Sequence, residues 1–288
     1  MIETDVVIVG VGSVGSMASW QLATRGLRVI GIDRFTIPGP FSAYAGESRV
    51  FRMVYAEGGH YTPLLQRARD LWRELEAACG AALLEITGVV TITDHDHPDH
   101  AALLRAGRER GLRFEAVTGQ EARWRLPQHL IRESDVALFD PEGGYVRSER
   151  AVFLAVQLAR RRGASFLGNR KVTALERHGD GWLVRTDQDE VRAPRVLIAT
   201  GTGAGPVCVP GMDGVVVAAG FSGHGFKMAT SLGAVAADLI AEGMTTTDIS
   251  FMDPARFLGH TAASRLFRWP VPHPDRSCCD QRLFLRAR

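Results

Sequence analysis

The sequence predicts an α/β fold, and three observations near its N-terminal end carry this prediction. An apolar, β-branched run at Asp5–Val9 is followed at once by a glycine-rich turn, Gly10–Gly15. A helical pattern then runs from Ser16 to Arg25. A second apolar run, Leu27–Ile32, ends on an acid, Asp33. A strand, a turn, a helix, a strand and an acid in this order are typical of a Rossmann-like dinucleotide-binding unit.

Each part of this βαβ unit has a physical role. Gly10 permits the tight turn, Gly12 lets the backbone approach a pyrophosphate, and Gly15 lets the helix pack closely on the strand. The N–H groups at the start of the helix favour an anion, because the helix dipole is positive there. Asp33 stands about 20 residues beyond the glycines, where a carboxylate accepts from a ribose hydroxyl. Because all these parts occur together, we expect a bound dinucleotide rather than a chance glycine-rich turn.

Composition excludes several other classes of protein. The chain has 288 residues, of which 45% are hydrophobic and 23% charged, with a net charge of +2. This balance favours neither nucleic acid nor a membrane as a partner, and no apolar stretch reaches the roughly 20 residues that span a bilayer. The four cysteines form no zinc-type pairs and fit a reducing, cytoplasmic setting; they are Cys79, Cys208, Cys278 and Cys279.

Two stretches of the first half carry unusual charge. Ala45–Tyr55 holds two arginines one helical turn apart, so a helix would put Arg49 and Arg52 on one face; alone, such a pair is more often a solvated surface. Asp94–His100 alternates acids and histidines. It has no spacing typical of a metal site, so we expect a polar loop without metal.

The remaining pattern alternates strands and helices. We expect helices at 62–80, 98–111, 121–126, 148–163 and 228–242. We expect strands at 87–93, 136–139, 145–146, 164–167, 171–175, 182–186, 191, 195–200 and 215–219, with a hairpin turn at His178–Gly181. From Gly259 the chain loses periodicity and is rich in arginine, which predicts a poorly ordered tail, residues 259–288.

A second glycine-rich turn decides which dinucleotide is expected. The buried strand expected at Val215–Ala219 leads into the second glycine-rich turn, Gly220–Lys227, and a helix follows this turn. Two such turns, far apart in the sequence, suit a long ligand held at both ends. FAD is long enough, whereas a nicotinamide dehydrogenase would continue with regular βα units.

These residues resemble the monomeric sarcosine oxidase and N-methyltryptophan oxidase family, FAD-dependent amine oxidases of the D-amino-acid-oxidase-like group. The resemblance covers most of residues 3–257. It rests on five motifs, which are GVGSVG at Gly10–Gly15, GIDR at Gly31–Arg34, ESRVFRMVYAEGGHYTPL at Glu47–Leu64, FDPEGGYVRSE at Phe139–Glu149 and VVVAAGFSGHGFK at Val215–Lys227. The last is the most specific.

The resemblance implies an FAD-binding domain over 1–84 and 147–258 and a reduced α+β substrate-domain fragment over 85–146. It implies that Arg52 and Lys227 bind the substrate carboxylate, and that Arg49 and His224 lie at the flavin. It also implies contacts to the cofactor from Gly10, Gly12, Ser13, Val14, Gly15, Asp33, Arg34, Ser42, Arg49, Val172, Thr200, Gly201, Gly220, Gly223, His224, Gly225 and Lys227.

The implied activity is oxidation of the C–N bond of an N-methyl or secondary amino acid, with oxygen as acceptor and peroxide as product. We expect a small-molecule substrate, no nucleic-acid or membrane partner, and a monomer. Family members have a long segment where this chain has only Thr202–Gly214. That segment carries the flavin-linking cysteine, an oxygen-activating lysine and pocket tyrosines, and it builds much of the substrate-domain sheet.

The short joint leaves two readings open. One is an amine oxidase; the other is a catalytically impaired flavin-binding remnant of the family. Cys208 lies in the joint without the family's flanking motif, so no covalent flavin link is assigned to it. Tyr44-Ala45 stands where the family has paired histidines. We also expect an uncovered apolar face on the fragment at about Glu85–Val146.

Overall fold

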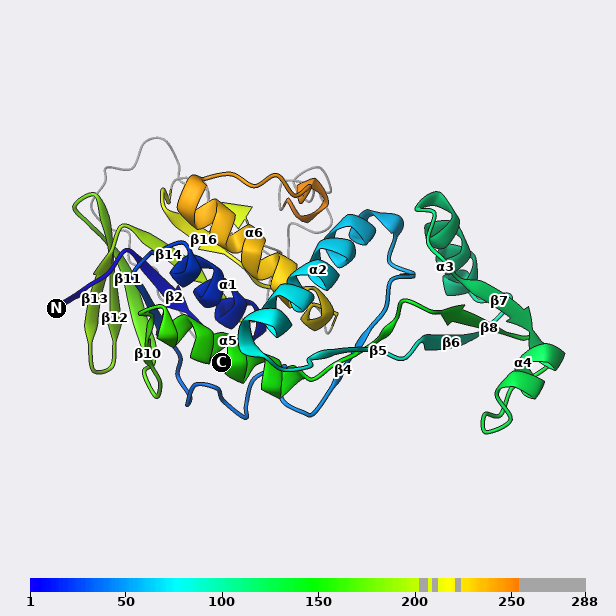
Figure 1. Ribbon diagram of the computed structural model, residues 1–288. Coiled ribbons are helices and arrows are strands. Elements are labelled where there is room, and N and C mark those ends of the chain that lie inside the picture. Colours follow the sequence, from blue (N-terminus) through cyan, green and yellow to red (C-terminus); the bar gives the residue numbers. More distant parts are fainter. Residues whose placement is uncertain (202–206, 209–211, 221–223, 254–288) are drawn as a thin grey trace. The chain divides into compact units, whose positions relative to one another are not determined.

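The computed structural model describes residues 1–201, 207–208, 212–220 and 224–253. It divides into two compact units. Unit 1 contains Met1–Ala45, Val152–Gly225 and the chain from Leu232 on, and unit 2 contains Gly46–Ala151 and Phe226–Ser231. Figure 1 follows the chain through both units.

Unit 1 is built on a six-stranded sheet that begins with the apolar run of the glycine-rich motif. Hydrogen-bonded neighbours are parallel except at the β15–β16 edge, which is antiparallel. In spatial order the strands are β10 (Ser165–Leu167), β3 (Val29–Ile32), β2 (Val6–Val9), β14 (Arg195–Ile198), β16 (Val215–Val217) and β15 (Val207–Cys208). The uninterrupted apolar strands fit a parallel sheet that is buried on both faces.

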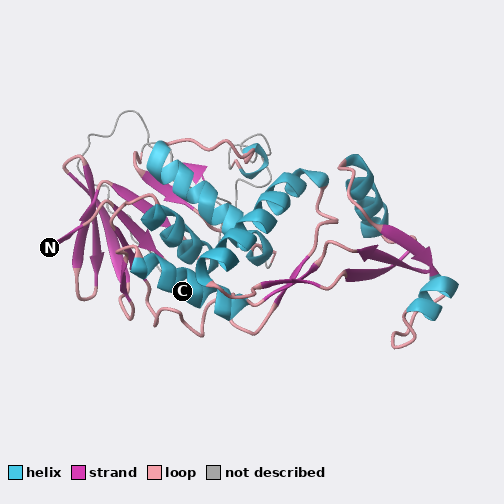
Figure 2. Ribbon diagram, viewed as in Figure 1, coloured by secondary structure: helices cyan, strands magenta, loops and turns pink. Residues whose placement is uncertain are grey.

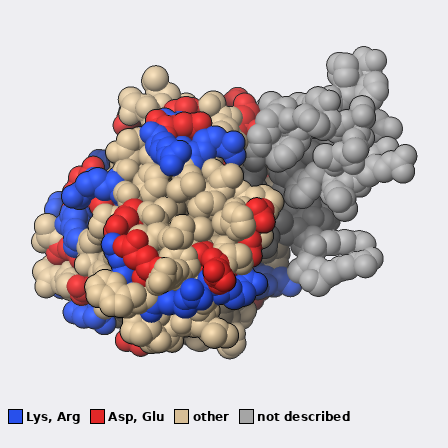
Figure 3. Space-filling model, turned by 90° about the vertical axis from the view of Figure 1, so that its right-hand side faces the viewer, with Lys and Arg blue, Asp and Glu red and all other residues tan. Residues whose placement is uncertain are grey.

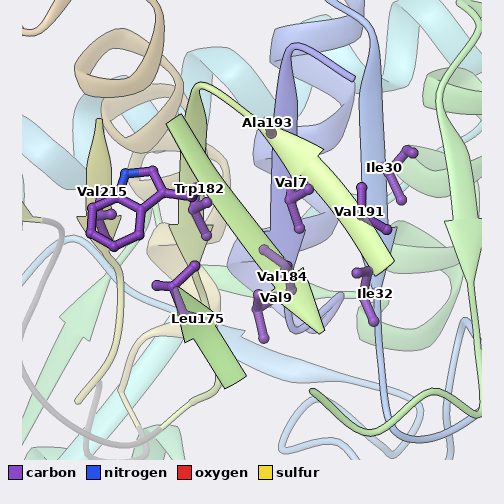
Figure 4. Packing of buried hydrophobic residues seen from close by; sticks show 11 residues of the cluster. Val7, Val9, Ile30, Ile32, Leu175, Trp182, Val184, Val191, Ala193 and Val215 are labelled. Carbon is purple, nitrogen blue, oxygen red and sulfur yellow. The ribbon is translucent and has the colours of Figure 1, made fainter. Parts of the chain in front are cut away.

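A second, four-stranded sheet covers one face of the first. Its order is β1 (Ile2–Glu3), β13 (Glu190–Ala193), β12 (Gly181–Thr186) and β11 (Val172–His178). The predicted hairpin is confirmed, since β11 and β12 pair antiparallel with His178 opposite Gly181. Figure 4 shows the core between the sheets, where Val7 and Val9 face Trp182 and Val184.

Helices cover the other face of the parallel sheet (Figure 1). Helix α1 (Ser13–Thr24) follows the glycine-rich turn, and α6 (Ala229–Glu242) packs closely on it. The contact depends on Gly233, where an added Cβ would lie 2.5 Å from the Met17 Cβ. The third long helix is α5 (Ser148–Arg161). This layering of two sheets and a helical layer confirms the predicted α/β, Rossmann-like fold.

Unit 2 contains two small sheets and three helices, shown in Figure 2. One sheet has the order β4 (Arg49–Phe51), β9 (Gly144–Val146), β5 (Leu84–Ile86), and the other β6 (Val89–Asp94), β8 (Asp135–Asp140), β7 (Glu115–Thr118). The helices are α2 (Thr62–Cys79), α3 (Pro98–Glu109) and α4 (Gly119–Arg125). Short 3₁₀ turns span Gly59–Tyr61, Phe226–Met228 and, in unit 1, Ser250–Met252.

The Ala45–Tyr55 stretch does not form the helix that would have put Arg49 and Arg52 on one face. Its centre is strand β4, which pairs antiparallel with β9, Phe51 opposite Gly144. Val50 and Phe51 favour a strand, and the pairing partner lies far along the chain, so helical charge spacing was the weaker signal. The 136–139 and 145–146 strands do form, but β8 and β9 join different sheets instead of pairing with each other.

The apolar face expected on the fragment is covered in part by its own helices. Helix α4 packs Ala122 against one face of the β6–β8–β7 sheet, beside Val117 and Ala137. Helix α3 packs Leu103 against Leu138 on the other face. Large apolar residues of unit 2 that remain exposed include Ile86 at 41%, Val90 at 36%, Trp124 at 81% and Leu130 at 98%.

The compact units divide the chain differently from the predicted domains. Residues 46–84, assigned to the FAD-binding domain from sequence, fall in unit 2 together with 85–146. The division into functional domains stays a prediction. The predicted tail, 259–288, lies outside the described residues.

No helix of the described chain is long and apolar enough to cross a membrane. On the face drawn in Figure 3, acidic and basic side chains are interspersed.

Candidate functional site

The turn between β2 and α1 forms a tight cradle in unit 1. Gly10 has a positive φ of 93°, and a Cβ there would lie 2.5 Å from the Ala199 carbonyl oxygen. A Cβ on Gly15 would lie 2.0 Å from the Gly10 carbonyl oxygen. Gly12, in contrast, has no atom within 4 Å of an added Cβ. Two glycines therefore close the turn, while the third leaves open space for a ligand, as the sequence predicted.

Helix α1 begins at this open space without a side-chain cap. Its N-cap residue is Gly12, and no side chain bonds to the first helical N–H groups. The first turn, from Ser13 and Val14, contains no acid. Uncapped N–H groups and the positive end of the helix dipole together favour a phosphate.

Asp33 stands at the end of β3, oriented by two backbone bonds. Its Oδ2 accepts from the Val11 N–H at 2.9 Å, and its Oδ1 accepts from the Phe35 N–H at 3.0 Å. An ionised carboxylate has about four acceptor positions, so ribose hydroxyls can still be bound. Arg34 is exposed, with its guanidinium 4.7 Å over the Phe35 ring.

Other predicted cofactor residues collect at the carboxyl ends of the parallel strands. Gly10 follows β2, Thr200 and Gly201 follow β14, and Gly220 follows β16. Ligands of open α/β sheets bind at this edge. Ser42 and Val172 are half-buried in unit 1, His224 is exposed and Gly225 is buried. Gly223 lies outside the described residues.

These observations fit FAD. An empty space faces Gly12, an uncapped helix start suits the pyrophosphate, and an oriented carboxylate suits a ribose. In unit 1 these groups would hold the adenosine diphosphate part of the cofactor. Their individual contacts stay predictions.

The predicted carboxylate-binding residues meet in unit 2 around one aromatic ring. The Lys227 ammonium lies 3.8 Å from the centroid of the Tyr55 ring, and the Arg52 guanidinium lies 5.3 Å from the same centroid. Lys227 is 5% exposed. One acid, Glu57, acts electrostatically on both Lys227 and Tyr55. Two cations held at one ring can together bind a carboxylate of a ligand.

Burial has a large effect on the ionisation of this cluster. It lowers the pKa of Lys227 to about 7, the charge of Arg52 lowers this pKa further, and Glu57 opposes the shift. Burial also raises the pKa of Tyr55 well above its ordinary value, with Glu57 adding to the rise. Tyr55 is therefore a neutral phenol, while Lys227 gains or loses its proton near neutral pH.

The backbone that carries Lys227 is held by α2. The Trp72 indole N–H donates to the Lys227 carbonyl at 3.0 Å, and the Trp72 ring stacks on Phe226 at 5.8 Å. The Thr230 hydroxyl donates to the Ala68 carbonyl at 3.0 Å. Because Trp72 is completely buried, its hydrogen bond holds the Lys227 backbone in one position within unit 2.

Arg49 has different surroundings from Arg52. Its Nη1 donates to the Ser48 carbonyl at 2.7 Å, and a Cβ on Gly46 would lie 3.0 Å from the same nitrogen. The structure thus brings Arg52 and Lys227 together and leaves Arg49 beside Gly46. Sequence reasoning missed Tyr55, although it lies in the Glu47–Leu64 stretch of the resemblance.

The Asp94–His100 segment brings three potential ligand groups close together. Side-chain atoms of Asp94, His95 and Asp96 lie within 4.8 Å of one another. They are exposed or half-buried, His95 pairs with Asp96 at 3.0 Å, and Arg132 approaches Asp94 at 3.8 Å. The expectation of a polar loop without metal stays a prediction.

The Lys227 pKa predicts a pH dependence of stability. In the unfolded chain the amine has its ordinary pKa of 10.5, and in the folded chain about 7. Between these values the unfolded state binds more protons, so the free energy of unfolding should rise with pH. Urea unfolding at pH 7 and pH 9 would measure the rise. The Lys227→Met variant should lose it, and an equal rise in the variant would contradict the assignment.

The fold and the cradle define an α/β dinucleotide-binding protein. The chain belongs to the FAD-dependent oxidoreductase family DAO, whose sequence model matches residues 5–213. It is 33% identical over 204 residues to the N-methyl-L-tryptophan oxidases of Yersinia pestis (strain Pestoides F) and Yersinia pseudotuberculosis (serotype O:1b, strain IP 31758). The match covers 69% of this chain and 54% of each relative. The chain thus spans about half the length of these curated relatives.

Solved structures with this fold include two further enzymes. L-proline dehydrogenase from P. horikoshii has a TM-score of 0.78 at 18% identity, covering 90% of this chain and 98% of that one. Glycine oxidase from Geobacillus kaustophilus has a TM-score of 0.76 at 17% identity, covering 88% and 98%. The predicted family, fold class and FAD cofactor are confirmed.

Proposed function

We propose that this chain is an FAD-dependent amine oxidase that oxidises the C–N bond of an N-methyl or secondary amino acid. The amine carbon loses a hydride equivalent, the resulting imine hydrolyses, and oxygen takes up the electrons to give hydrogen peroxide. FAD, when bound, supplies the two-electron chemistry. The observation that carries the proposal is that two cations, Arg52 and Lys227, both approach the ring of one buried tyrosine, Tyr55.

The residues of the chain have separate tasks in this proposal. Gly12, the start of α1 and Asp33 bind the dinucleotide in unit 1. Arg52 and Lys227 bind the substrate carboxylate in unit 2, and both approach the ring of the buried Tyr55. The identity of the relatives supports an N-methyl amino acid as substrate, since they are N-methyl-L-tryptophan oxidases. Arg49 and His224 are proposed as flavin contacts.

The test is an absorbance spectrum of the purified chain together with a peroxide assay on N-methyl-L-tryptophan and sarcosine. We expect a yellow protein that forms peroxide with at least one of them. The methyl esters of both compounds are the controls, because they lack the carboxylate. A yellow protein that forms no peroxide with any N-methyl amino acid would contradict the proposed turnover.

A second candidate function is flavin binding without turnover. The observation that favours it is the short joint Thr202–Gly214, together with the 54% share of the relatives that the chain matches. This reading predicts that FAD raises the unfolding temperature and that no peroxide forms. Peroxide formation at a rate that depends on substrate concentration would exclude it.

A further inference from the structure

Asp140 is a buried carboxylate whose partners are backbone N–H groups. It ends strand β8 and is only 3% exposed. Its Oδ2 accepts from the Met53 N–H at 2.6 Å and from the Val54 N–H at 3.2 Å. Its Oδ1 accepts from the Glu142 N–H at 3.1 Å. In the described part of the chain, no cation forms a salt bridge with it. Burying a carboxyl group is costly for the fold, so the position of Asp140 and its three hydrogen bonds indicate a role beyond filling space.

The two N–H groups bound by Oδ2 directly follow Arg52. Strand β4 ends at Phe51, and the segment from Arg52 to Tyr55 is neither helix nor strand. Met53 and Val54 are almost completely buried, so their N–H groups need a partner inside the protein. Without one, each would cost about as much as a lost hydrogen bond. Asp140 supplies both partners and so determines the path of the segment that carries Arg52.

The turn after Asp140 ties the same segment down from its other end. The Gly143 N–H donates to the Asp140 carbonyl at 3.2 Å, and β9 begins at Gly144 and pairs with β4. A Cβ on Gly144 would lie 1.9 Å from the Glu85 carbonyl oxygen, so the turn has little freedom. Asp140 and β9 therefore hold the residues on either side of Arg52.

We propose that Asp140 is a positioning residue for the substrate-carboxylate site, acting through the backbone of Met53 and Val54 to orient Arg52 and Tyr55. The inference rests on the proposed function, because it assumes that Arg52 binds a carboxylate. Asp140 acts on Arg52 through the backbone and not through a side-chain contact. Its substitution should therefore change the affinity for ligands that carry the carboxylate and not for those that lack it.

The test compares Asp140→Asn with a matched control, Glu76→Gln. Glu76 is also a carboxylate of unit 2 that accepts from two successive backbone N–H groups, those of Leu83 and Leu84, at 2.6 and 2.9 Å. It anchors the start of β5 instead of the Arg52 segment. Both substitutions change a carboxyl group that accepts from two successive backbone N–H groups, and Glu76 also pairs with Arg73 at 2.7 Å. Both should therefore lower stability, but only Asp140→Asn should change the carboxylate site.

The measurement is binding of indole-3-acetate and of its methyl ester to the FAD-loaded protein, followed by flavin absorbance. Neither compound has an oxidisable C–N bond at the acid, so binding is separated from turnover. We expect Asp140→Asn to lower the acid-to-ester affinity ratio by about tenfold, the value of roughly one charge-assisted hydrogen bond. Glu76→Gln should leave the ratio unchanged. An unchanged ratio in Asp140→Asn, or an equal loss in both variants, would overturn the inference.

A measurement on the unmodified chain covers the case that Asp140→Asn does not fold. Coupling is reciprocal, so a bound carboxylate should strengthen the Asp140 bonds. Hydrogen exchange at the Met53 and Val54 amides should then be slower with indole-3-acetate than with the ester. Equal exchange would overturn the inference. If the unmodified protein does not prefer the acid at all, the proposed carboxylate site itself fails, and the two failures are thereby distinguished.

Discussion

Replacing Gly12 with alanine is expected to weaken FAD binding by at least about a hundredfold while the apo-protein stays folded. A Cβ at Gly12 meets no atom within 4 Å, and the residue has an extended backbone with φ −79° and ψ −154°. Any amino acid can adopt this conformation, so the free energy of unfolding should stay equal or rise by about 0.5 kcal/mol. The methyl group would occupy the space that a pyrophosphate needs next to the start of α1.

Gly15→Ala is the matched contrast in the same turn. Its Cβ would lie 2.0 Å from the Gly10 carbonyl oxygen, so the strand and helix must separate. Overpacking of this kind costs about 1–3 kcal/mol, and the loss should appear in the apo-protein. Urea unfolding of both apo-proteins and FAD titration by flavin fluorescence would separate the two effects. Undiminished FAD affinity in Gly12→Ala would show that the pyrophosphate lies elsewhere.

Replacing Lys227 with methionine is expected to remove the preference for ligands that carry a carboxylate. Truncating one partner of a buried charged pair costs about 2–5 kcal/mol, which is at least about thirtyfold in affinity. Methionine has a similar volume and is uncharged, so the contact with Tyr55 is largely kept. The affinity for indole-3-acetate should fall, and the affinity for its methyl ester should change little. A fall of equal size for both ligands would indicate general damage.

The same site should show a characteristic pH dependence. Because the pKa of Lys227 is about 7 without ligand, the amine must take up a proton to bind an anion above that pH. The affinity of the unmodified protein for the acid should therefore decrease as pH rises from 7 to 9, by up to about tenfold per pH unit. The ester should show no such decrease.

A second lysine provides the control for these measurements. The chain has only two lysines, Lys171 and Lys227, and Lys171 is exposed at the start of β11. Lys171→Met makes the same substitution at the other lysine, outside the cluster around Tyr55. It should leave both the acid-to-ester ratio and its pH dependence unchanged. If it altered them as Lys227→Met does, the effect would come from net charge and not from the site.

Much of the fold could be predicted because its signals are local. The turn from Gly10 to Gly15, the apolar strands around it and Asp33 all lie within one short stretch, and each residue type is needed for a specific contact. The hairpin at His178–Gly181 is of the same kind. The helices that begin at Pro98 and Ser148 could be predicted from the residues of their first turns and from the spacing of their apolar residues.

The failures have one physical cause. Arg49 and Arg52 have helical spacing, yet β4 is a strand because it pairs with β9, which lies far away in the sequence. Tertiary pairing overrides local propensity at such positions. Asp140 gave no signal of its role either, since the N–H groups that it accepts from belong to a distant segment.

By itself the sequence determined the α/β class, the dinucleotide cradle, the family and the FAD cofactor. It also named Arg52 and Lys227, through motifs whose residues are contiguous. Only the tertiary structure decided that both cations approach the Tyr55 ring, that Trp72 holds the Lys227 backbone, and that Asp140 holds the segment after Arg52. These relations depend on burial and on contacts between distant segments, and burial is what lowers the Lys227 pKa to about 7.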